Sequence, residues 1–271
     1  MIKILSWNIA RRDECWEDVF NSDYDIALLQ EAHEPTVQVP DNATINPGEW
    51  KTAGYSKRNW RTAIVILSDK VDIEWINCNP IEVAQKNDLV VSRMGTLSVA
   101  KIIPKDGTEP LIIVSCYAVW EKPTLVAKSN EIYSDASAHR LISDISGLIG
   151  SQTKHRILLA GDFNILKRYG EHSNKYWGDR YSSVFDRFES IGIPFIGPNY
   201  PNGRQANPWP EELPIDSTCV PTFHHTRQTP ETATRQLDFV FASTKLKVDV
   251  KALNNLSEWG LSDHCKLEIT L

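Results

Sequence analysis

The sequence predicts an α/β protein in which two mainly antiparallel sheets pack face to face and helices cover their outer faces. Short apolar runs bounded by turn residues recur along all 271 residues. Apolar spacings of three and four, which are typical of helices, are confined to a few segments. No internal repeat or linker interrupts the chain, so we expect a single domain over residues 1–271.

The predicted strands are short runs rich in apolar and β-branched residues. They are residues 2–7, 25–30, 63–67, 71–76, 96–103, 111–117, 156–160, 237–241, 248–253 and 265–271. The turn sequence Ser68-Asp69-Lys70 joins two of these strands, and Pro104-Lys105-Asp106-Gly107 joins two others. Such short connections favour antiparallel, hairpin-like neighbours.

Three helices are predicted, around residues 16–20, over 134–149 and near 183–190. The second is the clearest, because its apolar residues recur at intervals of three and four positions. Residues 199–235 show little periodicity and are rich in proline. A structureless loop of this length inside one domain usually serves a function, although it could also be a solvated excursion.

Composition excludes several classes of protein. The net charge of −6 argues against a protein that coats DNA by bulk electrostatics, but it allows a local basic rim. The five cysteines include no C-x-x-C pair, so we expect reduced thiols and no zinc site. No signal-peptide pattern opens the chain and no apolar run approaches ~18 residues. We therefore expect a cytoplasmic, monomeric protein that does not bind membranes.

Polar and charged side chains gather at the ends of the predicted strands. They are Asn8, Glu31, Asp162, Asn164, Asp238, Asp263 and His264. Taken alone, each has an ordinary explanation: a turn residue, an exposed strand-end acid or a surface pair. Asp162 and Asn164 are more informative, because they flank Phe163 and alternation places both on one face of the strand.

Together these residues match the needs of metal-assisted phosphodiester hydrolysis. Carboxylate and amide oxygens are suited to Mg²⁺. One group must orient or deprotonate the attacking water, and donors must face the charge that grows on the phosphate oxygens. A histidine beside a carboxylate stays protonated and supplies such a donor.

The chain resembles the endonuclease/exonuclease/phosphatase superfamily at seven segments in the family's order. These are Trp7-Asn8, Gln30-Glu31, residues 61–68, Cys116-Tyr117, residues 161–164, residues 236–240 and Ser262-Asp263-His264. The resemblance implies a four-layer α/β sandwich with its site at one rim between the sheets.

The same resemblance implies a role for each strand-end residue. Glu31 is expected to be the main Mg²⁺ ligand, assisted by Asn8 and Asp263, with Mn²⁺ as an alternative ion. His264, held by Asp238, would contact the scissile phosphate. Two further residues complete the expected catalytic set: Asp162 would align or activate the water, and Asn164 would help to fix the phosphate.

Within the superfamily, Tyr117 and Arg140 resemble the exonuclease III and apurinic endonuclease branch. Tyr117 is neutral at pH 7 and can donate a hydrogen bond to phosphate. Residues 165–172, His224 and His225 depart from that branch, which leaves repair of damaged sites open.

Basic and aromatic residues are predicted to form the rim that binds substrate, since phosphates need neutralising and bases can stack. They are Arg11, Arg61, Arg140, Lys167, Arg168 and Trp177. The alternative is that these side chains only solvate loops.

Three functions compete. The first is a nuclease, with DNA favoured over RNA. The second is a phosphatase or phosphodiesterase for a nucleotide, inositol phosphate or other small phosphorylated molecule. The third is a non-catalytic module that kept the fold, which the intact set of acidic and histidine positions disfavours.

Overall fold

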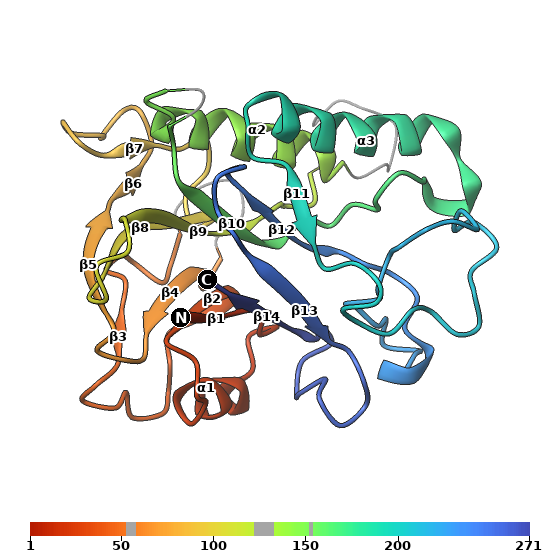
Figure 1. The fold of residues 1–271 in the computed structure, drawn as a ribbon, viewed down its shortest axis with the longest axis horizontal. Helices are drawn as coiled ribbons and strands as arrows, with labels where there is room; N and C mark the ends of the chain where they lie inside the picture. Colours follow the sequence, from red (N-terminus) through yellow and green to blue (C-terminus); the bar gives the residue numbers. More distant parts are fainter. Residues whose placement is uncertain (53–57, 122–132, 152–153) are drawn as a thin grey trace.

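The computed structural model describes residues 1–52, 58–121, 133–151 and 154–271. Two six-stranded sheets face each other, with α1 on the outer face of one and α2 and α3 on the outer face of the other (Figure 1). The predicted four-layer arrangement is therefore confirmed. None of the helices in the described ranges has the length and apolar character needed to cross a bilayer.

The first sheet carries both ends of the chain. Its strands lie in the order β13 (Asp249–Leu253), β14 (Lys266–Thr270), β1 (Lys3–Asn8), β2 (Ile26–His33), β4 (Trp60–Ile66) and β3 (Thr44–Ile45). The strands β1 and β2 run parallel, and they are joined through α1 (Asp13–Phe20). The buried residues Cys15, Trp16 and Val19 attach this helix to the sheet, since they belong to one apolar cluster with residues of β1 and β2.

The second sheet lies in the order β11 (Phe195–Gly197), β12 (Asp238–Ala242), β10 (Ile157–Asp162), β9 (Leu111–Tyr117), β8 (Leu97–Pro104) and β5 (Val71–Ile76). Here β9 and β10 run parallel, joined through α2 (Asp135–Ile145). A small parallel pair, β6 (Cys78–Asn79) and β7 (Leu89–Val90), lies beyond β5 in the chain. Helix α3 is Lys175–Ser190, and single 3₁₀ turns occur at Ser146–Leu148, Glu171–Ser173 and Pro230–Thr232.

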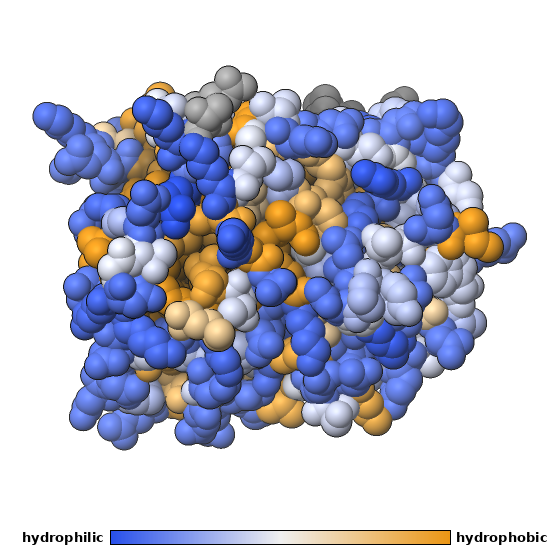
Figure 2. Space-filling model, in the orientation of Figure 1, coloured by the Kyte–Doolittle hydropathy of each residue, from blue (hydrophilic) through white to orange (hydrophobic). Residues whose placement is uncertain are grey.

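The core is divided by the two sheets. One cluster lies between them and contains Ile4, Ile26, Ile113 and Leu158. A second lies under α2 and α3, where Leu141 and other apolar residues of α2 are buried. On the face shown in Figure 2, hydrophobic side chains gather near the two chain ends and hydrophilic ones surround them.

The prediction that Ser68-Asp69-Lys70 joins a hairpin was wrong. β4 pairs with β2 and β3, whereas β5 pairs with β8 in the other sheet, so this turn carries the chain between sheets. β4 is buried along its whole length, and β2 and β3 occupy both of its edges, which leaves no edge on which β5 could pair.

Helix α3 begins eight residues before the predicted start near residue 183. The side chain of Asn174 caps it by accepting a hydrogen bond from the Tyr176 N–H (3.0 Å). Its first turns carry Tyr176 and Trp177, which contact other aromatic rings. The first turns of α3 contain no aliphatic residue, so the local sequence contains no apolar pattern that marks the true start.

The proline-rich loop, residues 199–235, contains no α-helix or β-strand. Its end is attached to the sheets by Phe223, which forms isolated β-bridges with Arg235 and His264. This attachment places the last part of the loop beside the strand ends.

Candidate active site

The predicted strand-end residues converge because the ends of five strands meet at one rim. In the first sheet, Asn8 of β1 lies beside Gln30 of β2. In the second, Asp162 of β10 lies between Tyr117 of β9 and Asp238 of β12. Asn8 and His264, which are 256 positions apart in the chain, are thus brought to 3.5 Å between Nδ2 and Nε2.

Local backbone features orient two of these residues. The pairing of β2 with β4 shifts between Leu29 and Ala32, and Glu31 within this bulge has φ 47°. Non-glycine residues adopt this left-handed region rarely, and it often marks functional sites. At Gly161, a Cβ would lie 1.8 Å from the Cys116 carbonyl oxygen. Only glycine lets β9 and β10 approach this closely just before Asp162.

His264 is buried and held by Asp238, with 2.8 Å between Nδ1 and Oδ2. The ring of Phe223 packs against the imidazole at 5.0 Å. Burial lowers the pKa of His264, but the charges of Asp238 and Asp162 raise it more, so its pKa lies well above the ordinary value. The ring is therefore an imidazolium whose Nε2–H faces Asp162, 3.8 Å away.

Asp162 is fixed by three hydrogen bonds. Its Oδ1 accepts from the Asn164 N–H (2.9 Å), and its Oδ2 accepts from the side-chain amides of Asn8 (3.0 Å) and Asn164 (3.2 Å). Burial raises its pKa and outweighs the positive charge of His264, so the pKa lies above the ordinary value. Such a carboxyl group is oriented for proton transfer near neutral pH.

Glu31 is contacted by donors on both oxygens. Tyr117 OH donates to Oε1 (3.1 Å), and Arg11 Nε lies 3.2 Å from Oε2. Burial and the charge of Glu31 raise the pKa of Tyr117 well above its ordinary value, so the phenol stays a donor. Trp60 packs edge-on against the Tyr117 ring at 4.9 Å.

These side chains surround a cavity of about 330 Å³ that we call the strand-end cavity. Its lining includes Arg11, Glu31, Tyr117, Asp162, Asn164, Asp263 and His264. Glu31 and Asp263 share this cavity although they come from opposite ends of the chain. The structure thus brings together the residues that the sequence singled out for chemistry.

The oxygen donors of the strand-end cavity fit a hard divalent cation such as Mg²⁺ or Mn²⁺. Asp162, Asp238 and His264 have ligand atoms within 4.8 Å of one another. However, Asp238 and His264 are hydrogen-bonded to each other, and Asp162 Oδ2 already accepts hydrogen bonds from two side-chain amides. Glu31 and Asp263 are the carboxylates with more capacity for an ion.

Asn8 is buried at the same site. Its Oδ1 accepts from the Ala10 N–H (3.0 Å), while its Nδ2 donates to Asp162. One lone pair of Oδ1 is left for another partner. The role of Asn8 as a metal ligand stays a prediction.

Of the six predicted substrate-binding residues, only Arg11 lines the strand-end cavity. Arg140 forms an ion pair with the carboxylate of Glu121, which Arg93 also contacts (3.2 Å). Glu121 follows Trp120, which lines the cavity, so Arg140 pairs with the chain neighbour of a lining residue.

The other four lie elsewhere. Arg61 is buried and lines a second cavity of about 450 Å³, the Arg61 cavity, together with Asn46, Trp75, Cys78, Met94 and Ser98. Lys167 and Arg168 line a third cavity beside Phe195. Trp177 packs against Tyr133 and Tyr181.

Several cavity residues were not predicted from the sequence. Trp120, Glu171, Tyr181 and Phe223 all line the strand-end cavity. Trp120 lies three residues after Tyr117, so its proximity to a strand end was a usable signal. Phe223 adjoins the unusual His224-His225 pair, but no local pattern indicates that it would pack on His264.

The chain belongs to the Endonuclease/Exonuclease/phosphatase family, whose sequence model matches residues 5–264. No curated protein matches it. A solved structure that shares the fold is the endonuclease domain of TRAS1, a telomere-specific non-LTR retrotransposon (14% identity, TM-score 0.61, covering 100% of this chain and 98% of that one).

Two other solved structures are similar. AP endonuclease LMAP from Leishmania major is 16% identical, with a TM-score of 0.61 and coverage of 99% of this chain and 86% of its own. The mannosyl-6-phosphatase Bt3783 of Bacteroides thetaiotaomicron is 14% identical, with a TM-score of 0.56 and coverage of 100% and 99%. At these identities the likeness shows the fold alone. The fold is thus shared by nucleases and a phosphatase.

Proposed function

We propose that the protein is a divalent-metal-dependent phosphodiesterase that cleaves nucleic acid, with DNA favoured over RNA. One observation carries this proposal. Asp162 and the His264–Asp238 pair face the same cavity as Glu31 and Asp263. A group that activates water and a protonated donor therefore lie opposite carboxylates suited to a cation.

A divalent ion bound by Glu31 and Asp263 would neutralise and polarise the phosphate. Tyr117 and Arg11 keep Glu31 in place by contacting both of its oxygens. This leaves Glu31 in one orientation, which metal-ligand carboxylates usually require.

His264 supplies a proton donor to the phosphate. Asp238 fixes the ring through Nδ1, so Nε2–H points to the cavity side of the imidazolium. There it stabilises the negative charge that develops on the non-bridging oxygens. Phe223 limits rotation of the ring by packing on its face.

Asp162 orients the attacking water and accepts its proton as the phosphorus–oxygen bond forms. Asn8 and Asn164 hold the carboxylate for this step through their amide hydrogens. The ester bond then breaks, the leaving oxygen takes a proton from a solvent water, and Asp162 returns the proton that it accepted to solvent. Besides water and the ion, this cycle uses the residues of the strand-end cavity and their hydrogen-bond partners Asn8 and Asp238.

Nucleic acid is supported by the rim of the cavity. Trp120 and Phe223 offer aromatic surface, and Arg11, His225 and Arg235 offer positive or protonatable groups. Bases stack on aromatic rings and phosphates pair with cations.

A phosphatase for a small phosphorylated molecule is the second candidate. The observation that favours it is that both arginines of the cavity are paired within the protein, Arg11 with Glu31 and Arg235 with Glu171 (3.1 Å). A long strand would need a track of free cations, whereas one phosphate group would not.

A substrate panel distinguishes these functions. Plasmid, single-stranded, abasic and RNA substrates would be assayed for strand cleavage with Mg²⁺ or Mn²⁺, beside nucleotides, sugar phosphates and inositol phosphates assayed for phosphate release. The Asp162→Ala variant is the blank. Cleavage of a polymer by the wild type alone supports the proposal. Phosphate release without polymer cleavage replaces it with the second candidate.

A further inference from the structure

The Arg61 cavity contains a buried cation that forms no ion pair with any residue that the structure describes. Arg61 is buried, and its guanidinium donates to the carbonyl oxygens of Asn46 (2.7 Å) and Thr62 (3.3 Å). Its Nε has no hydrogen-bond partner among the described residues. No carboxylate of the described residues lies within ion-pair distance of the Arg61 guanidinium, although Glu49 lines the cavity. An unpaired buried charge is costly, so the fold is expected to retain it only for a reason.

The thiol of Cys78 does not neutralise this charge. Cys78 lines the same cavity, but burial raises the pKa of its thiol to about 12. The thiol is therefore uncharged at neutral pH. The ring of Trp50 lies 4.2 Å from the guanidinium carbon and stabilises the cation without supplying a negative charge.

The arginine is held in position rather than left flexible. Asn46 accepts from the Ile64 N–H (2.8 Å) and donates to Ser98 Oγ (3.3 Å), so the residue whose carbonyl orients Arg61 is itself fixed. Gly95 approaches closely from the other side, since a Cβ there would lie 3.3 Å from Arg61 Cβ. Its φ of 77° also favours glycine.

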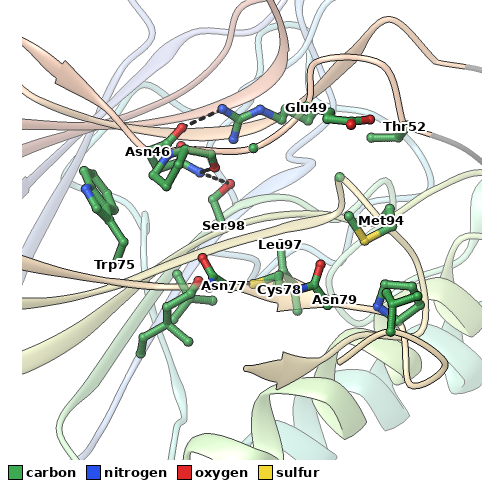
Figure 3. A pocket seen from close by; sticks show the side chains of 18 of the residues that line it. Asn46, Glu49, Thr52, Trp75, Asn77, Cys78, Asn79, Met94, Leu97 and Ser98 are labelled. Carbon is green, nitrogen blue, oxygen red and sulfur yellow. Dashed lines mark hydrogen bonds between the residues drawn. The ribbon is translucent and has the colours of Figure 1, made fainter. Parts of the chain in front are cut away.

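The rest of the lining is mixed. Trp75, Val83, Met94 and Leu97 are among its apolar residues, whereas Glu49, Lys51, Thr52, Asn77 and Asn79 are charged or polar. Figure 3 shows Trp75 and Met94 at its two sides, with Asn77, Cys78 and Asn79 opposite Glu49 and Thr52. A volume of about 450 Å³ is in the range of small-molecule sites. The fixed Arg61 cation, with Lys51 also in the lining and with apolar surface from Trp75 and Met94, is suited to a molecule with an acidic head and an apolar body.

This cavity is separate from the strand-end cavity. Trp60 and Arg61 are consecutive in β4, so their side chains lie on opposite faces of the strand. Trp60 packs against Tyr117 of the strand-end cavity, whereas Arg61 faces Asn46 and Trp50. Among the described residues, the two cavities have no lining residue in common.

We propose that the Arg61 cavity is a second binding site, for a small organic anion whose acidic group pairs with Arg61 and whose apolar or planar body packs against Trp75 and Met94. The proposal does not depend on which phosphate ester the strand-end cavity hydrolyses. It requires only that the molecule carry a carboxylate or phosphate head.

The test is titration calorimetry on the full chain, stripped of divalent metal. Indole-3-acetate and its neutral amide form one pair of probes, and adenosine monophosphate and adenosine form another. Inorganic phosphate tests whether an acidic head group without an organic body is enough for binding. We expect one of the organic anions to bind with a stoichiometry of one, and its neutral partner and phosphate to bind about tenfold more weakly or not at all.

Variants locate the site. Arg61→Met removes the cation, and Val83→Glu places a repelling charge at a lining position that is 62% exposed and so leaves the fold intact. Both substitutions should weaken binding of the organic anion about tenfold or more. Val90→Glu, at a position 43% exposed outside the cavity, is the matched control. The Glu31→Gln variant should bind the organic anion with the same affinity as the wild type.

The proposal is overturned if neither organic anion binds, or if binding is equal in the wild type, Arg61→Met and Val83→Glu. Loss of binding in Glu31→Gln alone would also overturn it, because the anion would then occupy the strand-end cavity.

Discussion

The strand-end cavity and the Arg61 cavity lie on opposite sides of β4, and their buried charges have opposite signs. The first collects Glu31, Asp162 and Asp263, with His264 as a protonated partner. The second holds Arg61, which forms no ion pair with the described residues. These groups indicate what each cavity can bind: a cation with phosphate beside the strand-end carboxylates, and an organic anion beside Arg61.

The largest effect should come from the acid that activates water. Asp162→Ala is expected to lower turnover about 10³-fold on whichever phosphate ester the panel identifies, because the base and its aligned water are lost. The measurement is the initial rate at saturating substrate. Asp216→Ala, at an exposed position in the proline-rich loop, is the control and should keep the wild-type rate. An active Asp162→Ala protein would remove this residue from the mechanism.

Glu31→Gln should have the next largest effect. It removes one charge from the proposed ion site and should weaken Mg²⁺ about a hundredfold. Thermal unfolding with and without Mg²⁺ measures this, because an ion that binds only the folded state raises Tm. Glu49→Gln, in the Arg61 cavity, should keep the full Mg²⁺ shift. Equal shifts in both variants would place the ion elsewhere.

In contrast to Arg61, Asp25 is a buried charged residue with partners of opposite charge or with hydrogen-bond donors. Its oxygens lie 2.9 Å from the Lys3 N–H and 3.1 Å from Lys70 Nζ. Asp25→Asn should cost about 2 kcal/mol of unfolding free energy at pH 7, because hydrogen bonds to a charged group are strong. Denaturant unfolding measures the loss.

The pH dependence of this loss follows from the pKa of Asp25. Burial raises that pKa, but the hydrogen bonds from Lys3, Ser68 and Lys70 lower it more, so the net shift is downward. A lowered pKa gives stability that is present above the unfolded value of about 3.9 and is lost as the pH falls through the folded value. The difference in stability between the two proteins should therefore begin to shrink near pH ~4 and disappear only below the lower folded pKa. A constant difference down to lower pH would contradict this origin.

Tyr117→Phe should have a smaller effect on the ion. The variant keeps the ring that packs against Trp60 but removes the hydroxyl that holds Glu31 Oε1. Groups that orient a metal ligand usually contribute about tenfold to affinity. The Mg²⁺ dependence of the rate measures this. An unchanged Mg²⁺ dependence with a lower maximal rate would instead assign the hydroxyl to the substrate.

The smallest effect on stability is expected for Arg61→Met. The variant loses two hydrogen bonds to carbonyl oxygens, but it also removes an unpaired buried cation. These terms oppose each other, so the unfolding free energy should change by less than about 1 kcal/mol. Denaturant unfolding of Arg61→Met and of Asp25→Asn compares the loss of an unpaired buried charge with the loss of a paired one. A loss as large as that of Asp25→Asn would mean that Arg61 has a structural role.

The strand-end residues could be located from local sequence patterns alone. Asp162 and Asn164 alternate around the core residue Phe163, and Glu31 follows an apolar strand. These patterns are local, since the period of a strand and the end of an apolar run are fixed by neighbouring residues. The order of such segments then indicated the family, which residues 5–264 match.

How distant segments meet depends on packing that no local pattern reveals. A turn sequence after β4 does not reveal that β5 joins the other sheet, because pairing depends on which edges are free. Nor does a basic residue reveal its cavity: Arg11 and Arg61 were predicted for one rim, yet β4 turns Arg61 to its opposite face. Phe223 reaches the His264 ring because its isolated bridges hold the end of its loop beside the strands. Local chemistry is encoded in short patterns, whereas the partner of each side chain is set by packing between elements far apart in the sequence.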